Sequence, residues 1–411
     1  MQRKTLAKSS AMMQKRIDRL MFWYSFAMSF PVILIFQNIS IYIFPFILLK
    51  VYELSGRFIS IKHTIQFLVI AFGIGALIST FNISDSLPSN SLMRALEVLP
   101  NYLYWVLLIL FFTSYSEYVN LEEVYKGIFW GLISSIFFYF FLQGFSVFNS
   151  FLFKNLSQNT FAFLLICFSP ITVWYAQKRY GLSSSVIILF ILAICGFLSG
   201  SRSGSLLTLS GGTIALILNR RSIGAVFISS FAIFIVLFFT INSSEVRSII
   251  LKLNPRTYEL LYESKKTFDQ DRSYLTRLAQ VEKSLIIFSK FPLSGVGLNN
   301  FTNYQVNLPG KFEGAEFVVN KKNIDRKSAH NSYFGFLAEG GLVLIVPFIL
   351  LLLYIMIWFF SRVNSVLPEY RPIFVGIIHM GIHLYFIYAI LNVFAWFLLG
   401  LGCMIIVKYK R

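Results

Sequence analysis

The chain has 411 residues, of which 56% are hydrophobic and only 13% charged, and its mean hydropathy is +0.69. A soluble domain needs more polar surface than this to cover its core, so the composition indicates a polytopic membrane protein. The formal net charge of +18 falls largely in short turns between apolar runs, where cytoplasmic lysines and arginines belong. No basic and aromatic module accompanies this charge, so nucleic acid is not an expected partner.

The apolar runs predict an all-α protein with about twelve transmembrane helices. Residues 1–20 are basic, lack a cleavage pattern and read as a cytoplasmic segment. Residues 21–241 hold nine spans, and residues 333–407 hold three more before a basic cytoplasmic tail at 408–411. The spans whose limits are clearest cover about 21–37, 39–53, 65–81, 98–114, 124–142, 159–175, 223–241 and 333–360. We expect a tight turn at Gln37 and Asn38 between the first two.

Between the ninth and tenth spans lies a polar loop, residues 242–332, which the positions of the short basic loops place on the periplasmic side. Within it, apolar residues recur at helical spacing from Arg272 to Lys290, which predicts an amphipathic helix on the outer membrane surface or capping the bundle. Pro292 ends this helix, and a glycine turn follows at 293–300.

Three arginines are candidates for binding phosphate. Arg202 lies between serines and glycines at the junction of two spans, where the open backbone and the guanidinium fork suit an anion. The alternative is an interfacial arginine that reaches lipid headgroups. Arg277, with Arg272 nearby, could form a second clamp or lie on a solvated helix face. Gly295 and Gly297 do not form a nucleotide-binding loop.

His330 directly precedes the tenth span, so its ring can be partly shielded from water and can accept a proton near neutral pH. A helix cap or an interfacial histidine is the alternative reading, and Asn331 is itself a good N-cap residue. Glu339 lies inside the span and needs a partner there, so it either supports the site or packs against an arginine. His379 and His383 share a helix face but have no third ligand nearby, and we expect no metal.

Four runs, in this order and spacing, resemble the O-antigen polymerase and O-antigen ligase superfamily of bacterial membrane glycosyltransferases. They are Ser199 to Leu207 (SGSRSGSLL), Arg277 to Gln280 (RLAQ), Phe291 to Phe301 (FPLSGVGLNNF) and Ala329 to Leu342 (AHNSYFGFLAEGGL). The resemblance implies a helical GT-C-type fold and no metal or nucleotide cofactor. It also implies that Arg202 and Arg277 grip a diphosphate and that His330 is the base, whereas Arg272 has no secure counterpart.

The resemblance further implies transfer of a glycan from undecaprenyl diphosphate at the periplasmic face of the bacterial inner membrane. The implied partners are the lipid-linked oligosaccharide, a glycan acceptor and a chain-length regulator. We favour an O-antigen polymerase, which joins repeat units. The alternatives are an O-antigen ligase, which transfers the glycan to lipid A-core, and a membrane transporter. The transporter is disfavoured because the spans hold few charged residues near mid-membrane apart from Glu339.

Overall fold

The computed structural model describes residues 2–30, 34–83, 87–144, 158–199, 201–218, 248, 272–308, 329–389 and 392–410. Within these ranges the chain forms twelve helices and no strand, which confirms the all-helical class. The helices are α1 (Gln2–Ser29), α2 (Leu34–Ser55), α3 (Thr64–Phe81), α4 (Ser91–Ser114), α5 (Leu121–Gly144), α6 (Gln158–Tyr180), α7 (Leu182–Leu198), α8 (Arg202–Leu218), α12 (Arg272–Lys290), α13 (Ser332–Arg362), α14 (Arg371–Leu384) and α15 (Val393–Lys410).

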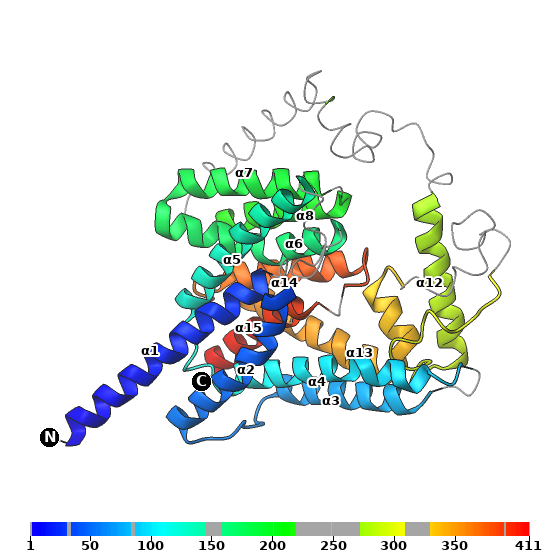
Figure 1. Ribbon diagram of the computed structural model, residues 1–411, viewed down its shortest axis with the longest axis horizontal. Coiled ribbons are helices and arrows are strands. Elements are labelled where there is room, and N and C mark those ends of the chain that lie inside the picture. The colour runs from blue at the N-terminus through cyan, green and yellow to red at the C-terminus, as the bar shows by residue number, and fades with distance from the viewer. Residues whose placement is uncertain are drawn as a thin grey trace.

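The helices pack in two adjoining groups (Figure 1). In one, α3 lies between α4 and α13, and α15 packs on α4. The interior of this group is aromatic, because Trp105 of α4 stacks on Trp396 of α15 with ring centroids 4.7 Å apart, and Phe72 of α3 lies 5.0 Å from Trp396. In the other group, α6 contacts α7, α8 and α14, while α1 packs along α5. The large buried rings fix how these helices meet.

The break between the first two helices differs from the sequence prediction. We expected a turn at Gln37 and Asn38, but both residues are helical within α2. The first helix instead ends at Ser29, two residues before Pro31. Proline lacks a backbone N–H and disfavours helical backbone at the residue before it, which explains a break at this point. The expected turn was therefore wrong by several residues.

Several helices match the expected membrane spans. Among the described residues, four helices are long and apolar enough to cross a membrane: Thr64–Phe81, Ser91–Ser114, Asn159–Tyr180 and Ser332–Arg362. Shorter apolar helices cover Leu182–Leu198, Ser203–Leu218, Arg371–Leu384 and Val393–Tyr409. The chain is a membrane protein. The ninth expected span, 223–241, lies outside the described residues, and the count of twelve spans stays a prediction.

The predicted amphipathic helix is confirmed as α12, with the expected limits Arg272–Lys290. It packs on α13 and stands across the end of the bundle where α3 ends (Figure 1). Its buried face is largely small or polar, and Leu278 and Leu285 of the apolar stripe are exposed. Lipid tails are as apolar as leucine, so an apolar stripe does not identify the face that touches protein. The helix caps the bundle through a mixed face of four polar residues, Thr276, Gln280, Lys283 and Ser284, with Ala279 and Ile287 between them.

Candidate active site

The glycine turn that follows α12 docks onto a break in α13. The backbone of α13 leaves the helical conformation at Gly341, with φ 58° and ψ −157°. Carbonyl and amide groups freed by this break need partners, because no water reaches them in a packed interior. Four backbone hydrogen bonds of 2.9–3.0 Å supply them: Val296 N–H to Ala338 O, Gly297 N–H to Glu339 O, Leu342 N–H to Pro292 O and Val343 N–H to Leu293 O.

Two glycines permit this docking. Gly295 has φ +65°, and a Cβ there would collide with the Ala338 carbonyl oxygen and the Glu339 backbone. A Cβ at Gly341 would collide in the same way with the backbone of Leu293. Glycine adopts left-handed backbone without steric cost and lets two main chains approach closely. Gly295 and Gly341 are therefore needed for the glycine turn to dock on α13, which is a structural role and not nucleotide binding.

Glu339 joins the glycine turn to a third segment. Its carboxylate accepts hydrogen bonds from the Phe301 backbone N–H at 3.3 Å and from the Tyr388 hydroxyl at 2.8 Å. Burial raises the pKa of the Tyr388 phenol, and the nearby carboxylate raises it further, so the phenol keeps its proton and donates. Both readings left open by the sequence have a counterpart here, since Glu339 bonds to Phe301 and Tyr388 and also lies within the electrostatic influence of Arg94. The positive charge of Arg94 on α4 stabilises the ionised form of this carboxylate.

Arg94 also holds the glycine turn from the side of α4. Its guanidinium donates to the Asn303 side-chain oxygen. Beside it, the Asn300 side chain donates to the Ser91 carbonyl at 3.1 Å. From α12, the Lys283 ammonium lies 4.8 Å from the centroid of the Phe301 ring, a cation–π contact. The glycine turn is thus fixed by α4, α12 and α13 together.

His330 has unusual backbone for a histidine, with φ +44° and a half-buried side chain. Such a left-handed residue persists when its neighbours are firmly held, and it often marks a functional position. Ala329 before it is buried. After it, the Asn331 side chain accepts from the N–H groups of Tyr333 and Phe334 at 3.0 and 3.2 Å, which caps α13. The predicted N-cap at Asn331 is confirmed.

Ser332 ties this corner to the segment between α14 and α15. Its hydroxyl donates to the Ile387 carbonyl at 2.7 Å and accepts from the Ala389 N–H at 3.1 Å. Tyr388, between those two residues, reaches Glu339. The chain after His330 is therefore anchored to another segment, and Ala329 before it is buried.

Arg277 is half-buried on α12 and interacts electrostatically with His383 at the end of α14. His383 is fully buried, and its ring stacks on Phe163 with centroids 5.6 Å apart. Neither ring nitrogen of His383 has a hydrogen-bond partner among the described residues, and the same holds for Oε1 of the buried Gln280, one helical turn from Arg277. Buried polar atoms without partners are uncommon and mark places where a bound molecule or water completes the site.

The structure describes the backbone of Arg202 and Arg272 but not their side chains. Arg202 is the first residue of α8, and Gly204 of that helix packs against Ala162, next to Phe163. The start of α8 is therefore close to the Phe163 ring, which stacks on His383. Together with the contacts of Ser332 and Arg277, this puts the backbone of Arg202, Arg277 and His330 at one end of the helical bundle.

The order of these segments along the chain matches a known family. Residues 187–349 match the family model of O-antigen ligase. This chain carries an O-antigen ligase domain. The match supports the O-antigen polymerase and ligase superfamily that the motifs of this chain resemble. A comparison with curated protein sequences found no match.

The O-antigen ligase domain runs from α7 into α13 and includes Arg202, Arg272, Arg277, His330 and Glu339. Residues outside it also build the site, and sequence reasoning missed them. Arg94 could have been identified from the sequence, since it is a lone arginine at the start of an apolar span. Tyr388 carried none, because nothing in its local pattern indicates a partner on α13.

The histidine pair on α14 divides into two roles. His379 contacts the Val375 carbonyl through Nδ1 at 2.8 Å and the Ser210 hydroxyl through Nε2 at 3.1 Å, so it joins α14 to α8. His383 forms no such bond within the described part of the chain, and its ring interacts electrostatically with Arg277. In the same described part, no group of three or more His, Cys, Asp and Glu side chains is placed to hold a metal ion.

Proposed function

We propose that the protein is a metal-independent glycosyltransferase that joins oligosaccharide repeat units carried on undecaprenyl diphosphate, as an O-antigen polymerase does. Members of the matched family are glycosyltransferase-like enzymes, and lipid-linked glycans are the substrates that the family implies. The observation that carries the proposal is His330, a left-handed, half-buried histidine inside the matched domain, with a buried residue before it and the anchored start of α13 after it.

In the proposed reaction, His330 accepts the proton of a hydroxyl group on the acceptor sugar. The hydroxyl oxygen attacks the anomeric carbon of the donor and forms the new glycosidic bond. The bond from that carbon to the diphosphate oxygen breaks, and undecaprenyl diphosphate leaves with the electron pair. Attack from the opposite face inverts the configuration at the anomeric carbon. The proton on His330 then passes to solvent.

The charge that grows on the leaving diphosphate is where a fixed cation lowers the barrier most. We assign this role to Arg202 and Arg277, with Arg272 on the same helix as Arg277 as a further candidate. Among the described residues, the ring nitrogens of His383 and the side-chain oxygen of Gln280 have no hydrogen-bond partner, which supports a polar ligand beside Arg277. Asn331 and Glu339 act as supports, one capping α13 and the other holding the glycine turn.

The test uses purified protein in lipid with an undecaprenyl-diphosphate-linked oligosaccharide, with and without a chelator. His330→Asn is the informative variant, because asparagine tolerates left-handed backbone but is no base. We expect the rate of bond formation to fall about 10²–10⁴-fold, with an unchanged amount of folded protein. Arg277→Ala should also lose activity, whereas Arg179→Ala, an exposed arginine at the far end of α6, should not. A wild-type rate from His330→Asn would reject the proposed base.

A second candidate function is transfer of the finished glycan to lipid A-core, because the matched family is described as O-antigen ligase. Gene deletion separates the two. Lipopolysaccharide that carries a single repeat unit indicates a polymerase, while long lipid-linked chains with bare core indicate a ligase. Movement of the lipid-linked glycan across vesicles without a new glycosidic bond would instead favour a transporter.

A further inference from the structure

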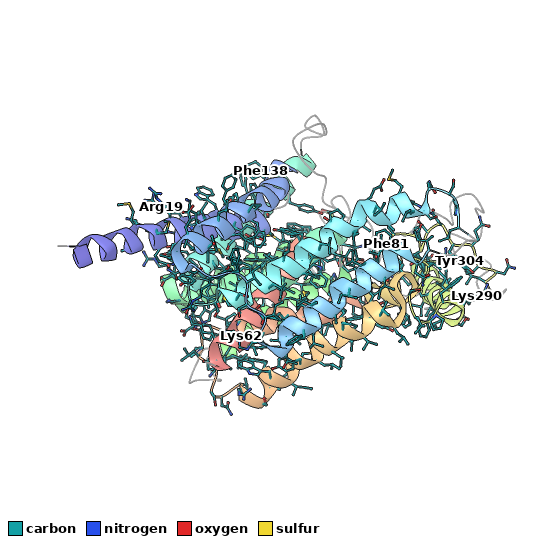
Figure 2. All side chains as sticks on the ribbon, turned by 90° about the horizontal axis from the view of Figure 1, so that it is seen from below. Arg19, Lys62, Phe81, Phe138, Lys290 and Tyr304 are labelled. Atoms are coloured by element: carbon teal, nitrogen blue, oxygen red, sulfur yellow. The ribbon has the colours of Figure 1, made fainter. Side chains whose placement is uncertain are left out.

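A cavity of about 550 Å³ lies beside the start of α3 and the end of α4. The connection between α2 and α3, residues 56–63, forms one wall, and the end of α4 with the turn after it forms the other. Figure 2 shows Lys62, which lines the cavity, at the opposite end of α3 from Phe81 and away from Tyr304 and Lys290. The cavity is therefore separate from the candidate active site, and its size is in the range of small-ligand sites.

A buried amide fixes the shape of this cavity. Gln66 is fully buried, and its side-chain nitrogen donates to the Ser60 carbonyl at 2.7 Å and to the Thr113 hydroxyl at 3.1 Å. Its oxygen accepts the backbone N–H groups of Lys62 and His63 at 2.6 and 3.0 Å. These bonds hold the connection against α4 before any ligand arrives, so binding does not have to order the loop.

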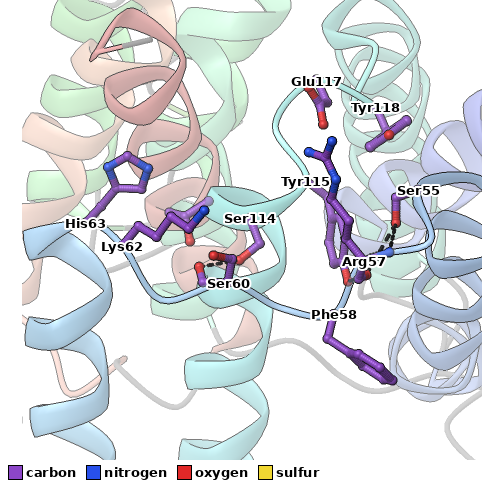
Figure 3. A pocket seen from close by; sticks show the side chains of 11 residues that line it. Ser55, Arg57, Phe58, Ser60, Lys62, His63, Ser114, Tyr115, Glu117 and Tyr118 are labelled. Carbon is purple, nitrogen blue, oxygen red and sulfur yellow. Dashed lines mark hydrogen bonds between the residues drawn. The ribbon is translucent and has the colours of Figure 1, made fainter.

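The walls carry more positive than negative charge. Arg57 and Lys62 are cations, His63 stands at the start of α3, and Glu117 is the acidic residue among those that line the cavity. Figure 3 shows the Arg57 guanidinium directed toward Glu117 and the Lys62 side chain beside Ser60 and Ser114. Neither Arg57 nor Lys62 forms an ion pair with another described residue. Cations, hydroxyl groups and a helix N-terminus together suit a phosphate group.

Apolar surface begins at the rim of the cavity. Phe58 is 78% exposed, and its ring packs against Tyr52 with centroids 4.7 Å apart. Phe46 and Leu49 of α2 and Phe67 of α3 are exposed as well. On helices of a membrane protein, such side chains face lipid tails. A ligand with a phosphate head and acyl chains would match both surfaces, whereas free phosphate would use only the polar one.

We propose that this cavity binds the headgroup of an anionic glycerophospholipid, with the phosphate at Arg57 and Lys62 and the acyl chains along the exposed faces of α2 and α3. The cavity lies on the face where the short basic loops fall, which the charge distribution predicts to be cytoplasmic. Basic pockets between membrane helices on that side bind phosphorylated lipid headgroups. The proposal does not depend on the glycosyl transfer proposed above.

The test is lipid binding by purified, delipidated protein, measured by native mass spectrometry and by the midpoint of thermal unfolding. Phosphatidylglycerol is the probe, phosphatidylcholine is the neutral lipid, and inorganic phosphate and glycerol 3-phosphate are the soluble probes. We expect wild-type protein to prefer phosphatidylglycerol. The double variant Arg57→Ala, Lys62→Ala should lose at least tenfold in affinity for it, since each cation near an anionic lipid contributes appreciably.

The matched control removes two exposed cations elsewhere on the same face, in Lys126→Ala with Arg179→Ala, and should keep the preference. If the alanine pair does not fold in neutral lipid, Arg57→Gln with Lys62→Gln keeps the side-chain length and removes the charge. An equal preference in cavity and control variants would overturn the proposal. Saturation by glycerol 3-phosphate or inorganic phosphate that blocks lipid binding completely would also overturn it, in favour of a soluble phosphate site.

Discussion

Substitution of Gly295 tests whether the glycine turn is held by its docking on α13. Alanine at φ +65° is strained, and left-handed backbone costs an L-residue about 1–2 kcal/mol. The added Cβ also collides with the backbone at Ala338 and Glu339, so the hydrogen bonds from Val296 and Gly297 must lengthen or break. Two backbone hydrogen bonds contribute about 1–3 kcal/mol together. We therefore expect Gly295→Ala to destabilise the protein by about 2–5 kcal/mol.

Gly56 offers the matched control. Its φ of +61° is close to the +65° of Gly295, but a Cβ there would meet nothing within 4 Å. Gly56→Ala should show the strain alone, about 1–2 kcal/mol. The assay is the midpoint of thermal unfolding in detergent, followed by intrinsic fluorescence. Hydrogen exchange at Leu342 and Val343, whose amides donate to the glycine turn, gives a local readout and should rise only in Gly295→Ala. Equal midpoint shifts for the two variants, with unchanged exchange, would refute the docking.

Three further predictions concern buried polar contacts. Glu339→Leu should lower the free energy of unfolding by about 1–3 kcal/mol, because the Tyr388 hydroxyl loses its acceptor. Glu339→Gln should be milder. Equal unfolding midpoints for the leucine variant and wild type would contradict this prediction. Asn331→Ala should lower the free energy of unfolding by about 0.5–2 kcal/mol and reduce the rate of glycosyl transfer, whereas Asn331→Asp should keep the cap. Full activity of the alanine variant would show that the cap does not position the base. Gln66→Leu should weaken phosphatidylglycerol binding as much as Lys62→Ala does, because the loop that carries Lys62 loses its hydrogen bonds to the Gln66 side chain. Unchanged binding would show that these bonds are not needed to position Lys62.

Much of the architecture follows from the sequence. Long apolar runs leave the helix as the structure that satisfies the backbone within a bilayer, so the all-α class was predictable. The limits of α12 were predictable too, because periodicity and Pro292 mark its end locally. The cap at Asn331 was equally visible, since capping depends on neighbours three residues away at most. The four motif runs were enough to indicate the superfamily that the match over residues 187–349 supports.

Other features were decided only by the tertiary structure. The partners of Glu339 are Phe301 and Tyr388, 38 and 49 residues away in the chain, and no local pattern encodes such distances. Leu278 and Leu285 of α12 are exposed, and because lipid is as apolar as a protein core, hydropathy could not choose between the two faces of this helix. The left-handed backbone of His330 likewise depends on anchors from distant segments. Local sequence fixes what a segment can form, whereas burial and long-range hydrogen bonds fix which face it presents and which residues it meets.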